Sequence, residues 1–251
     1  MALAKIDLHH KPTCVLRFKL KSGAEMGVGR KYQGSVMGQT NREIAKVGFW
    51  AALTALSGSI GYDTVQILQM VGVLRPPWDG VFIYGFSLVI PTPFLIAMLA
   101  LHFLVPEERK FWSQAAVVFS SLYVVFGTFN YVVQLATVIP ASFQGTLEPI
   151  RLLDQTPHSM FWDADAIGYL FMGLATLLGA RVFTPKGLQK WARGFFLANA
   201  AITPLVAIVY FYPFFSTTLI WLASPWAVTE GGSILMLVLL FKKMRKGSFG
   251  L

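Results

Sequence analysis

The sequence predicts an all-α integral membrane protein, built as a bundle of six transmembrane helices. Of its 251 residues, 55% are hydrophobic and only 13% are charged, whereas a soluble domain carries about 25% charged residues. Six apolar stretches each approach or exceed the roughly 20 residues that a bilayer crossing needs. Almost every Lys and Arg falls in the gaps on one side of these stretches, which is the pattern of a polytopic membrane protein.

The six predicted spans occupy most of the chain after residue 46. Their expected ranges are 47–73, 81–104, 112–139, 163–183, 192–212 and 216–241. Because proline removes a helical hydrogen bond, Pro91 and Pro93 are expected to kink the second span. Pro225, or the pair Gly231 and Gly232, is expected to break or kink the sixth span.

The parts outside the spans are one long loop and two basic tails. Residues 140–162 form the longest external loop, in which residues 147–153 are expected to make a short amphipathic segment at the membrane interface. Residues 242–251 form a basic cytoplasmic tail, and residues 1–46 carry nine Lys and Arg. We expect the N-terminal tail to lie on anionic lipid headgroups at the cytoplasmic face, with docking to a cytoplasmic partner or under the bundle as the alternative. The alternation of apolar and basic residues over 16–21 is strand-like.

The distribution of positive charge predicts the orientation of the chain. Of the 21 Lys and Arg residues, 19 fall on the side of the spans that carries both tails, and only Arg75 and Arg151 fall on the other. The positive-inside rule therefore places both termini in the cytoplasm, and we expect the plasma (inner) membrane as the location. The net charge of +9 is explained by these flanking segments, so no nucleic-acid partner is expected.

Polar residues recur at helical spacing inside five of the spans, so that each span has one polar face. These faces are Ser59, Asp63, Gln66 and Met70 in the first span; Tyr123, Gly127, Asn130 and Gln134 in the third; Asp165, Tyr169, Met172 and Thr176 in the fourth; Asn199, Thr203 and Tyr210 in the fifth; and Trp226, Glu230 and Ser233 in the sixth. Polar residues also join helices in membranes. The sequence leaves open a polar core satisfied by its neighbours or a cavity filled with ligand or water.

Two acids, Asp63 and Glu230, are predicted to lie well inside the spans. At about 1.5 Å per residue, both fall near the middle of a hydrocarbon core about 30 Å thick. An ionisable side chain at that depth costs about 2.5–3.5 kcal/mol even on insertion scales and usually has a function. We expect each acid to be protonated, hydrogen-bonded or exposed to water. By contrast, Asp163 and Asp165 are expected at the start of the fourth span, where acids cap a helix, with an acidic mouth as the alternative.

These observations give a candidate site and three candidate functions. The predicted ligand-binding residues are Asp63, Gln66, Tyr123, Asn130, Gln134, Tyr169, Asn199, Trp226 and Glu230. The first function is binding or transport of a small amphipathic or cationic molecule. The second is an isomerase or cyclase on a lipophilic substrate, with Asp63 or Glu230 as the acid. The third is an accessory subunit with a membrane-protein partner. The sequence leaves any cofactor unknown. No metal site is predicted, because no histidine pair has ligand spacing and Cys14 is the only cysteine.

Overall fold

The structure, a computed structural model, describes the backbone of residues 24–246 and the side chains of residues 38–246 apart from Thr217. The strand-like pattern predicted over residues 16–21 lies outside the described residues. The chain divides into two compact units, 1–38 and 39–251, and the fold and the site described below belong to the second. Within the described range every regular element is a helix and no strand occurs.

Over the residues that the structure describes, six helical stretches are long and apolar enough to cross a membrane, which confirms the predicted number. They are Gly38–Met70, Trp78–Leu104, Glu107–Phe143, Met160–Val182, Gly187–Phe211 and Thr218–Arg245. The largest difference from the prediction is at the first helix, α1, which spans Ala24–Met70 and so begins well before residue 47. Hydropathy assigns residues 24–46 to a tail because they are polar, but polarity does not end a helix.

Several of the stretches consist of more than one helix. The remaining elements are α2 (Trp78–Val89), α3 (Pro91–Leu104), a 3-10 turn at Glu107–Arg109, α4 (Lys110–Val133), a π-helical turn at Gln134–Val138, α5 (Ile139–Phe143), a 3-10 helix at Glu148–Leu153, α6 (Met160–Gly179), a 3-10 turn at Ala180–Val182, α7 (Gly187–Phe211), α8 (Thr217–Ala223) and α9 (Pro225–Arg245). The 3-10 helix at Glu148–Leu153 occupies the segment for which a short interfacial element was predicted.

Prolines separate the helices in the second and sixth stretches. Helix α2 gives way to α3 at Ile90, directly before Pro91. In the same way α8 and α9 meet at Ser224, directly before Pro225, and α9 runs unbroken through Gly231 and Gly232. Of the alternatives for the sixth span, the break is therefore at the proline, which lacks the N–H that would continue the helix.

At one end of the bundle, glycines with positive φ and a serine cap determine where helices end and begin. Gly72 follows α1 and Gly145 follows α5, both with positive φ (74° and 68°), a conformation in which only glycine avoids a steric cost. Helix α6 begins at Met160, and the side chain of Ser159 accepts a hydrogen bond from the backbone N–H of Trp162. These features fix where the long loop between α5 and α6 leaves and re-enters the bundle.

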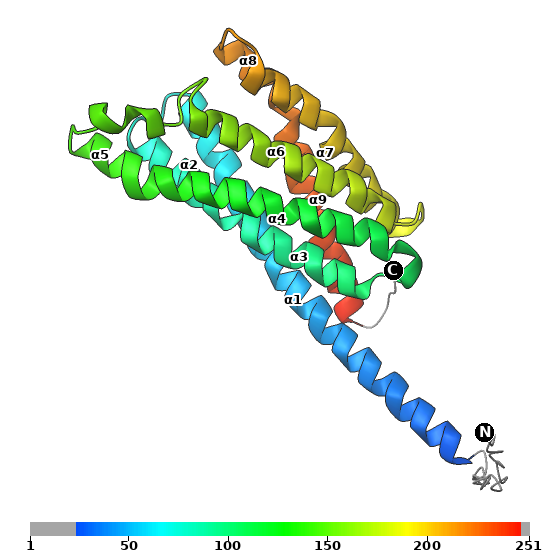
Figure 1. Ribbon diagram of the computed structural model, residues 1–251. Helices are drawn as coiled ribbons and strands as arrows, with labels where there is room; N and C mark the ends of the chain where they lie inside the picture. The colour runs from blue at the N-terminus through cyan, green and yellow to red at the C-terminus, as the bar shows by residue number, and fades with distance from the viewer. Residues whose placement is uncertain (1–23, 247–251) are drawn as a thin grey trace, which may run out of the picture. The chain divides into compact units, whose positions relative to one another are not determined.

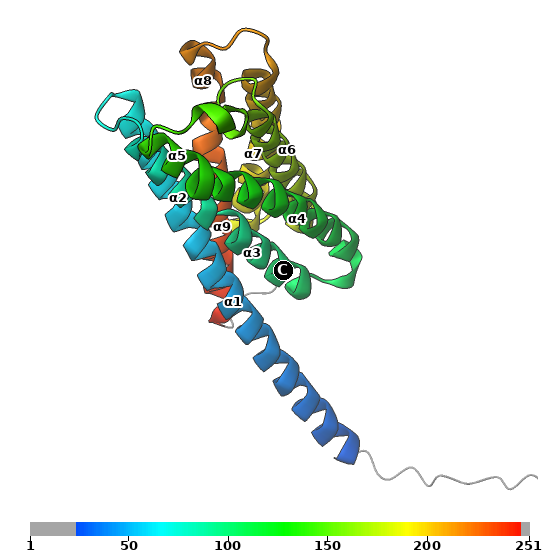
Figure 2. The same cartoon turned by 60° about the vertical axis from the view of Figure 1, so that its left-hand side comes forward.

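The helices pack in a definite order, shown in Figures 1 and 2. Helix α4 lies between α3 and α6, α6 packs on α7, and α7 packs on α9. Helix α1 contacts α9 where Gly48 faces Phe241, and it contacts α2 where Gly61 faces Phe86. The chain therefore places α1, α4, α6, α7 and α9 around one interior.

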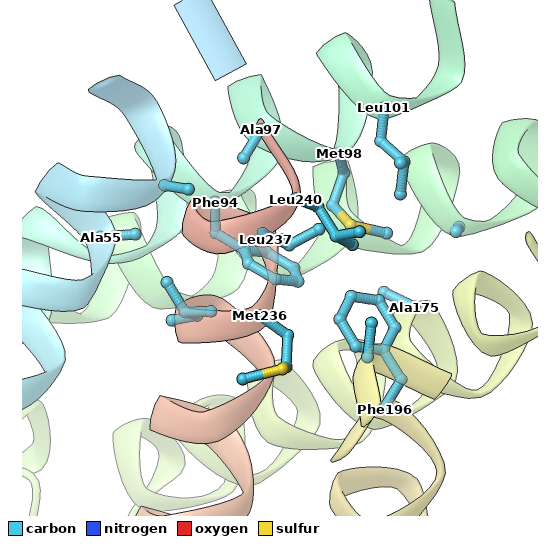
Figure 3. Close-up of a cluster of buried hydrophobic side chains, with 14 of the residues drawn as sticks. Ala55, Phe94, Ala97, Met98, Leu101, Ala175, Phe196, Met236, Leu237 and Leu240 are labelled. Carbon is cyan, nitrogen blue, oxygen red and sulfur yellow. The ribbon is translucent and has the colours of Figure 1, made fainter. Parts of the chain in front are cut away.

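One half of that interior is apolar, and it is shown in Figure 3. Phe94 and Met98 of α3 point toward Leu237 of α9, with Phe196 of α7 on the opposite side. All four side chains are fully buried. This half lies toward the end of the bundle that holds the connections 105–109 and 183–186 and the end of α9, where the Lys and Arg of these segments gather. We call this the basic end.

Candidate functional site

The other half of the interior is polar, and its centre is Asp165 on α6. Tyr131 of α4 and Tyr210 of α7 donate their hydroxyls to its two oxygens, at 3.1 and 2.6 Å. The side-chain amide of Gln155 donates to the same carboxyl at 3.0 Å. Three donors on three separate segments converge on this carboxyl, which is 4% exposed, and this arrangement suits a carboxylate because the ionised group only accepts hydrogen bonds.

The predicted role of Asp165 as a helix-capping residue is therefore wrong. Helix α6 begins at Met160 and Ser159 caps it, so Asp165 lies in the second turn and faces the bundle rather than the free N–H groups. Asp163 lies in the first turn, where the expected interaction with the helix dipole applies. The signal was present in the sequence, because Asp165 belongs to the predicted polar face of its span.

Gln155, a loop residue, ties the long connection to the bundle. Its side-chain oxygen accepts a hydrogen bond from Asn130 at 2.8 Å, and its backbone N–H donates to Gln134 at 3.3 Å. Gln134 in turn donates to the backbone carbonyl of Leu153 at 2.8 Å. Partial burial in this folded loop raises the pKa of Asp154, although the nearby charge of Arg151 opposes the shift. The loop thus closes over the polar half of the interior.

Asn130 and Gln134, both predicted site residues, hold this loop at a special point of the third stretch. Gln134 begins the π-helical turn, and Asn130 lies one turn earlier in α4. Both side chains are fully buried. A π-helical turn changes the phase of the residues that follow it and is frequent at functional sites. The Oδ1 atom of Asn130 has no hydrogen-bond partner among the described residues.

A line of aromatic side chains runs inward from Asp165. The hydroxyl of Tyr169 on α6 lies within hydrogen-bonding reach of Tyr210 on one side and of Tyr62 of α1 on the other. Trp226 of α9 places its ring edge-on to Tyr169, with centroids 4.8 Å apart, and to Tyr62, at 6.3 Å. Tyr169 and Trp226, predicted from two separate spans, are thus brought into direct contact.

Glu230 on α9 lies at the inner limit of this polar region. Its side chain is 1% exposed, and its Oε2 atom accepts a hydrogen bond from Ser59 of α1. Its Oε1 atom has no partner among the described residues. One turn further along α1, the half-buried Asp63 lies close enough to act electrostatically on Glu230. The two acids predicted inside the membrane therefore share one neighbourhood.

Tyr123 connects the regions around the two buried acids. It is 3% exposed on α4, and its side chain lies within electrostatic range of both Glu230 and Asp165. Tyr62 lies within range of the same two acids and of Asp63. Three carboxyls from α1, α6 and α9 therefore surround the same group of aromatic side chains.

The structure does not bring every predicted site residue into this group. Asn199 is fully buried, but it donates to Thr176 at 3.1 Å and accepts from Thr229 at 3.3 Å, so it joins α6, α7 and α9. That arrangement is the helix-joining role that polar residues have in membranes. The side chain of Gln66 is half-buried and takes part in none of the side-chain hydrogen bonds among the described residues.

A groove on the outer face of α1 and α3 is separate from this site. It has a volume of about 560 Å³ and includes Trp50 and Thr54 of α1 and Pro93 and Ile96 of α3. None of the predicted site residues lines it. The polar region around Asp165 and Glu230 is built from side chains packed against one another, and the predicted open cavity there remains a prediction.

The fold and this site fit an integral, polytopic membrane protein with a polar interior. Among the described residues, no group of three His, Cys, Asp or Glu side chains is placed to hold a metal ion. Comparison with protein-family models, with curated proteins and with solved structures finds no match for this chain. The arguments on function therefore start from its own residues.

Proposed function

We propose that this protein binds or transports a small amphipathic or cationic molecule at its buried acids. The observation that carries the proposal is the unpartnered Oε1 atom of Glu230 in an almost fully buried side chain. An acceptor left without a partner at that depth costs about 1–3 kcal/mol, and more when it is charged. Proteins commonly keep an unpartnered buried group of this kind at sites where a ligand or a proton supplies the missing partner.

The balance of charge inside the bundle favours a positively charged ligand. Asp63, Asp165 and Glu230 contribute three carboxyls to one region, and no Lys or Arg is among the buried residues of the described chain. An ionised acid in the membrane normally pairs with a basic side chain or faces water. A cation that binds between these acids supplies the positive charge that no buried side chain of the described chain supplies.

The aromatic side chains around the acids support the same conclusion. Trp226 packs edge-on against both Tyr62 and Tyr169, whose hydroxyls lie within hydrogen-bonding reach of each other, and Tyr62 is within electrostatic range of Glu230. The faces of Tyr and Trp rings attract cations, and a quaternary ammonium group is the ligand that such clusters recognise. Their apolar area also suits the hydrocarbon part of an amphipathic molecule.

The charge at the ends of the bundle supports an orientation for this function. The basic end holds Arg109, Lys110, Arg181 and Lys186 together with the lysines at the end of α9. The opposite end, which includes the 71–77 and 144–159 connections and which we call the polar end, holds Arg75 and Arg151. We infer from the positive-inside rule that both termini face the cytoplasm, and that the site lies nearer the outer side of the plasma (inner) membrane.

Binding of two cations of known structure tests the proposal. Purified protein in lipid nanodiscs is titrated with tetraethylammonium and with the more lipophilic tetraphenylphosphonium. We expect saturable binding of at least one of them, with a dissociation constant raised about tenfold or more by Glu230→Gln or Asp165→Asn, which is the effect of losing about 1.4 kcal/mol. Glu108→Gln, an exposed acid at the basic end, is the matched control and should bind as the wild type does.

The outcomes that contradict the proposal are equally definite. Absence of saturable binding for both cations, or wild-type affinity in both acid variants, would remove the role of these carboxyls in ligand binding. The same preparations incubated with a lipid extract test the alternative of an isomerase or cyclase, because that function requires a chemical change in the extract that Glu230→Gln abolishes.

A further inference from the structure

We propose that protons exchange between Asp165 and Glu230 along a line of three tyrosine hydroxyls. The line consists of Tyr210, Tyr169 and Tyr62, in that order from Asp165. The protonation of Glu230 is thereby controlled from the polar end of the bundle. The coupling of that proton to a ligand rests on the function proposed above, whereas the proton path itself does not.

The outer part of the line is given by direct contacts. Tyr210 donates to Asp165 at 2.6 Å, and the Tyr169 hydroxyl lies within hydrogen-bonding reach of Tyr210 and Tyr62. The rings of Tyr169 and Tyr210 have their centroids 5.7 Å apart. Three hydroxyls from α7, α6 and α1 are therefore consecutive, and each can give up one proton while it accepts another.

The inner part of the line crosses one face of α1. Ser59, Tyr62 and Asp63 are spaced three and four residues apart, so they share that face. Ser59 donates a hydrogen bond to Glu230, and Tyr62 and Asp63 both lie within electrostatic range of Glu230. The last transfer passes across this face from the Tyr62 hydroxyl to the carboxylate of Glu230.

The transfer is balanced in atoms and charge. The step begins when Asp165 takes up a proton at the polar end and the Tyr210 hydroxyl turns its proton from Asp165 toward Tyr169. Asp165 then gives its proton to the Tyr210 oxygen, and each tyrosine passes its own hydroxyl proton to the next oxygen along the line, which ends at the ionised carboxylate of Glu230. At the end the O–H bond of Asp165 is broken and an O–H bond of Glu230 is formed. Every tyrosine has gained one proton and lost one, so no buried tyrosinate and no oxidant or reductant is required.

The apolar half of the interior gives the line an end. Beyond Glu230 and Ser233, the buried side chains of α9 are all apolar and include Ile234, Leu237 and Leu240, which belong to one cluster with Phe94 and Met98 of α3. These side chains carry no oxygen that could take a proton on from Glu230, so α9 does not continue the line toward the basic end. The line therefore loads and unloads Glu230 from the polar end and does not form an open channel through the protein.

The groups that face the two acids are consistent with this assignment. Around Asp165 lie the hydroxyls of Tyr131 and Tyr210 and the amides of Gln155 and Asn130. Around Glu230 the titratable neighbours are Asp63, Tyr62 and Tyr123, together with the Ser59 hydroxyl. No basic side chain is among these neighbours in the described part of the chain, so a proton is the cation that the protein can supply to Glu230 without a ligand.

Hydrogen–deuterium exchange of the Glu230 carboxyl tests the proposal directly. Infrared spectra of the protein in nanodiscs are recorded between about pH 5 and pH 8, a range that begins just above the ordinary pKa of a carboxyl group. The C=O band of protonated Glu230 is identified as the band that is absent from Glu230→Gln. The rate at which this band shifts after transfer to D2O measures proton access. We expect Tyr169→Phe and Tyr210→Phe, which remove only the hydroxyl, to slow the shift about tenfold or more, as the loss of about 1.4 kcal/mol in the barrier requires.

Tyr84→Phe is the matched control, because Tyr84 packs beside Tyr131 with ring centroids 6.3 Å apart but lies outside the line. It should exchange at the wild-type rate. The proposal is overturned if both Phe variants exchange as fast as the wild type, if Tyr84→Phe slows the shift equally, or if no band is lost in Glu230→Gln at any pH in the range. Exchange that depends on Tyr169 in a protein that binds neither cation would leave the proton path in place and reject the ligand-binding function alone.

Discussion

Ser59 on α1 donates a hydrogen bond to Glu230 on α9, across 171 positions of the sequence. The bond joins the first and the last membrane helix, and it satisfies one of the two oxygens of a carboxyl that is 1% exposed. The Cβ atom that Gly231 lacks would lie 3.5 Å from the Ser59 hydroxyl oxygen, so the two helices are in close contact at this point. The polar interior is therefore held together at Glu230 as well as at Asp165.

The first prediction concerns this bond. Ser59→Ala leaves the Glu230 carboxyl without its donor in a site closed to water, which costs about 1–3 kcal/mol. We expect the free energy of unfolding in mixed detergent micelles to fall by that amount. Ser57→Ala, an exposed serine on the same helix whose hydroxyl bonds only to the backbone of Thr54, should change it by no more than about 0.5 kcal/mol. Equal effects of the two variants would show that the Glu230 bond contributes nothing to stability.

The second prediction concerns the contact between α6 and α7 at Gly173. A Cβ atom at this position would lie 2.2 Å from the Oγ1 atom of Thr203 and 2.7 Å from its Cβ atom, so Gly173→Ala must push the two helices apart. Overpacking of this kind costs about 1–3 kcal/mol, and we expect a lower midpoint of thermal unfolding in detergent.

Gly194→Ala on α7 is the control for that change. Nothing lies within 4 Å of the Cβ atom it would add, and alanine is a better helix former than glycine by about 1 kcal/mol. The two Gly→Ala variants should therefore shift the unfolding midpoint in opposite directions. A midpoint for Gly173→Ala at or above that of the wild type would contradict the close packing of α6 on α7.

The six membrane helices were predictable from the sequence because hydropathy and length alone decide them, and the break before Pro91 follows from the chemistry of proline. The polar faces were also predictable from helical spacing, which placed Tyr169, Glu230 and Asn130 correctly in the interior. What spacing cannot give is which face meets which. Asn199 was predicted to bind a ligand, and spacing gave no sign that Thr176 and Thr229 on other helices hydrogen-bond to it; its contact with a ligand stays a prediction.

The misjudged depth of Asp165 has a different origin. A helix start that is displaced by three residues moves a side chain from the end of a helix into its second turn, and hydropathy does not fix a boundary to that accuracy. Gln155 was missed because it lies in a loop, where no periodicity indicates direction. Only the folded chain shows that this residue reaches back to Asp165 and Asn130.

The third prediction concerns Gln155 and the loop it holds. Gln155→Ala removes the amide that donates to Asp165 and accepts from Asn130, while the backbone bond to Gln134 remains. We expect the amides of residues 146–159 to exchange with D2O about tenfold faster, as the loss of about 1.4 kcal/mol from a local opening reaction requires. Amides in the middle of α4 should keep their protection.

Gln144→Ala provides the comparison for that experiment, because Gln144 lies in the same connection with an exposed side chain. Its loop amides should exchange at wild-type rates. If Gln155→Ala also leaves the loop amides unchanged, the hydrogen bonds of Gln155 do not hold the loop closed, and its backbone contacts with Gln134 are sufficient.

The fourth prediction concerns orientation, which the arrangement of helices alone does not decide. The connections 144–159 and 183–186 lie at opposite ends of the bundle, and the second end carries most of the positive charge. Single cysteines are introduced by Thr156→Cys and Pro185→Cys in a Cys14→Ser background, so that no charged residue is changed. Because positively charged loops stay in the cytoplasm, a membrane-impermeant maleimide should label intact cells carrying Thr156→Cys, and should label Pro185→Cys only after the membrane is permeabilised. The reverse pattern would place both termini outside, and labelling of both positions in intact cells would contradict the crossing of the membrane between them.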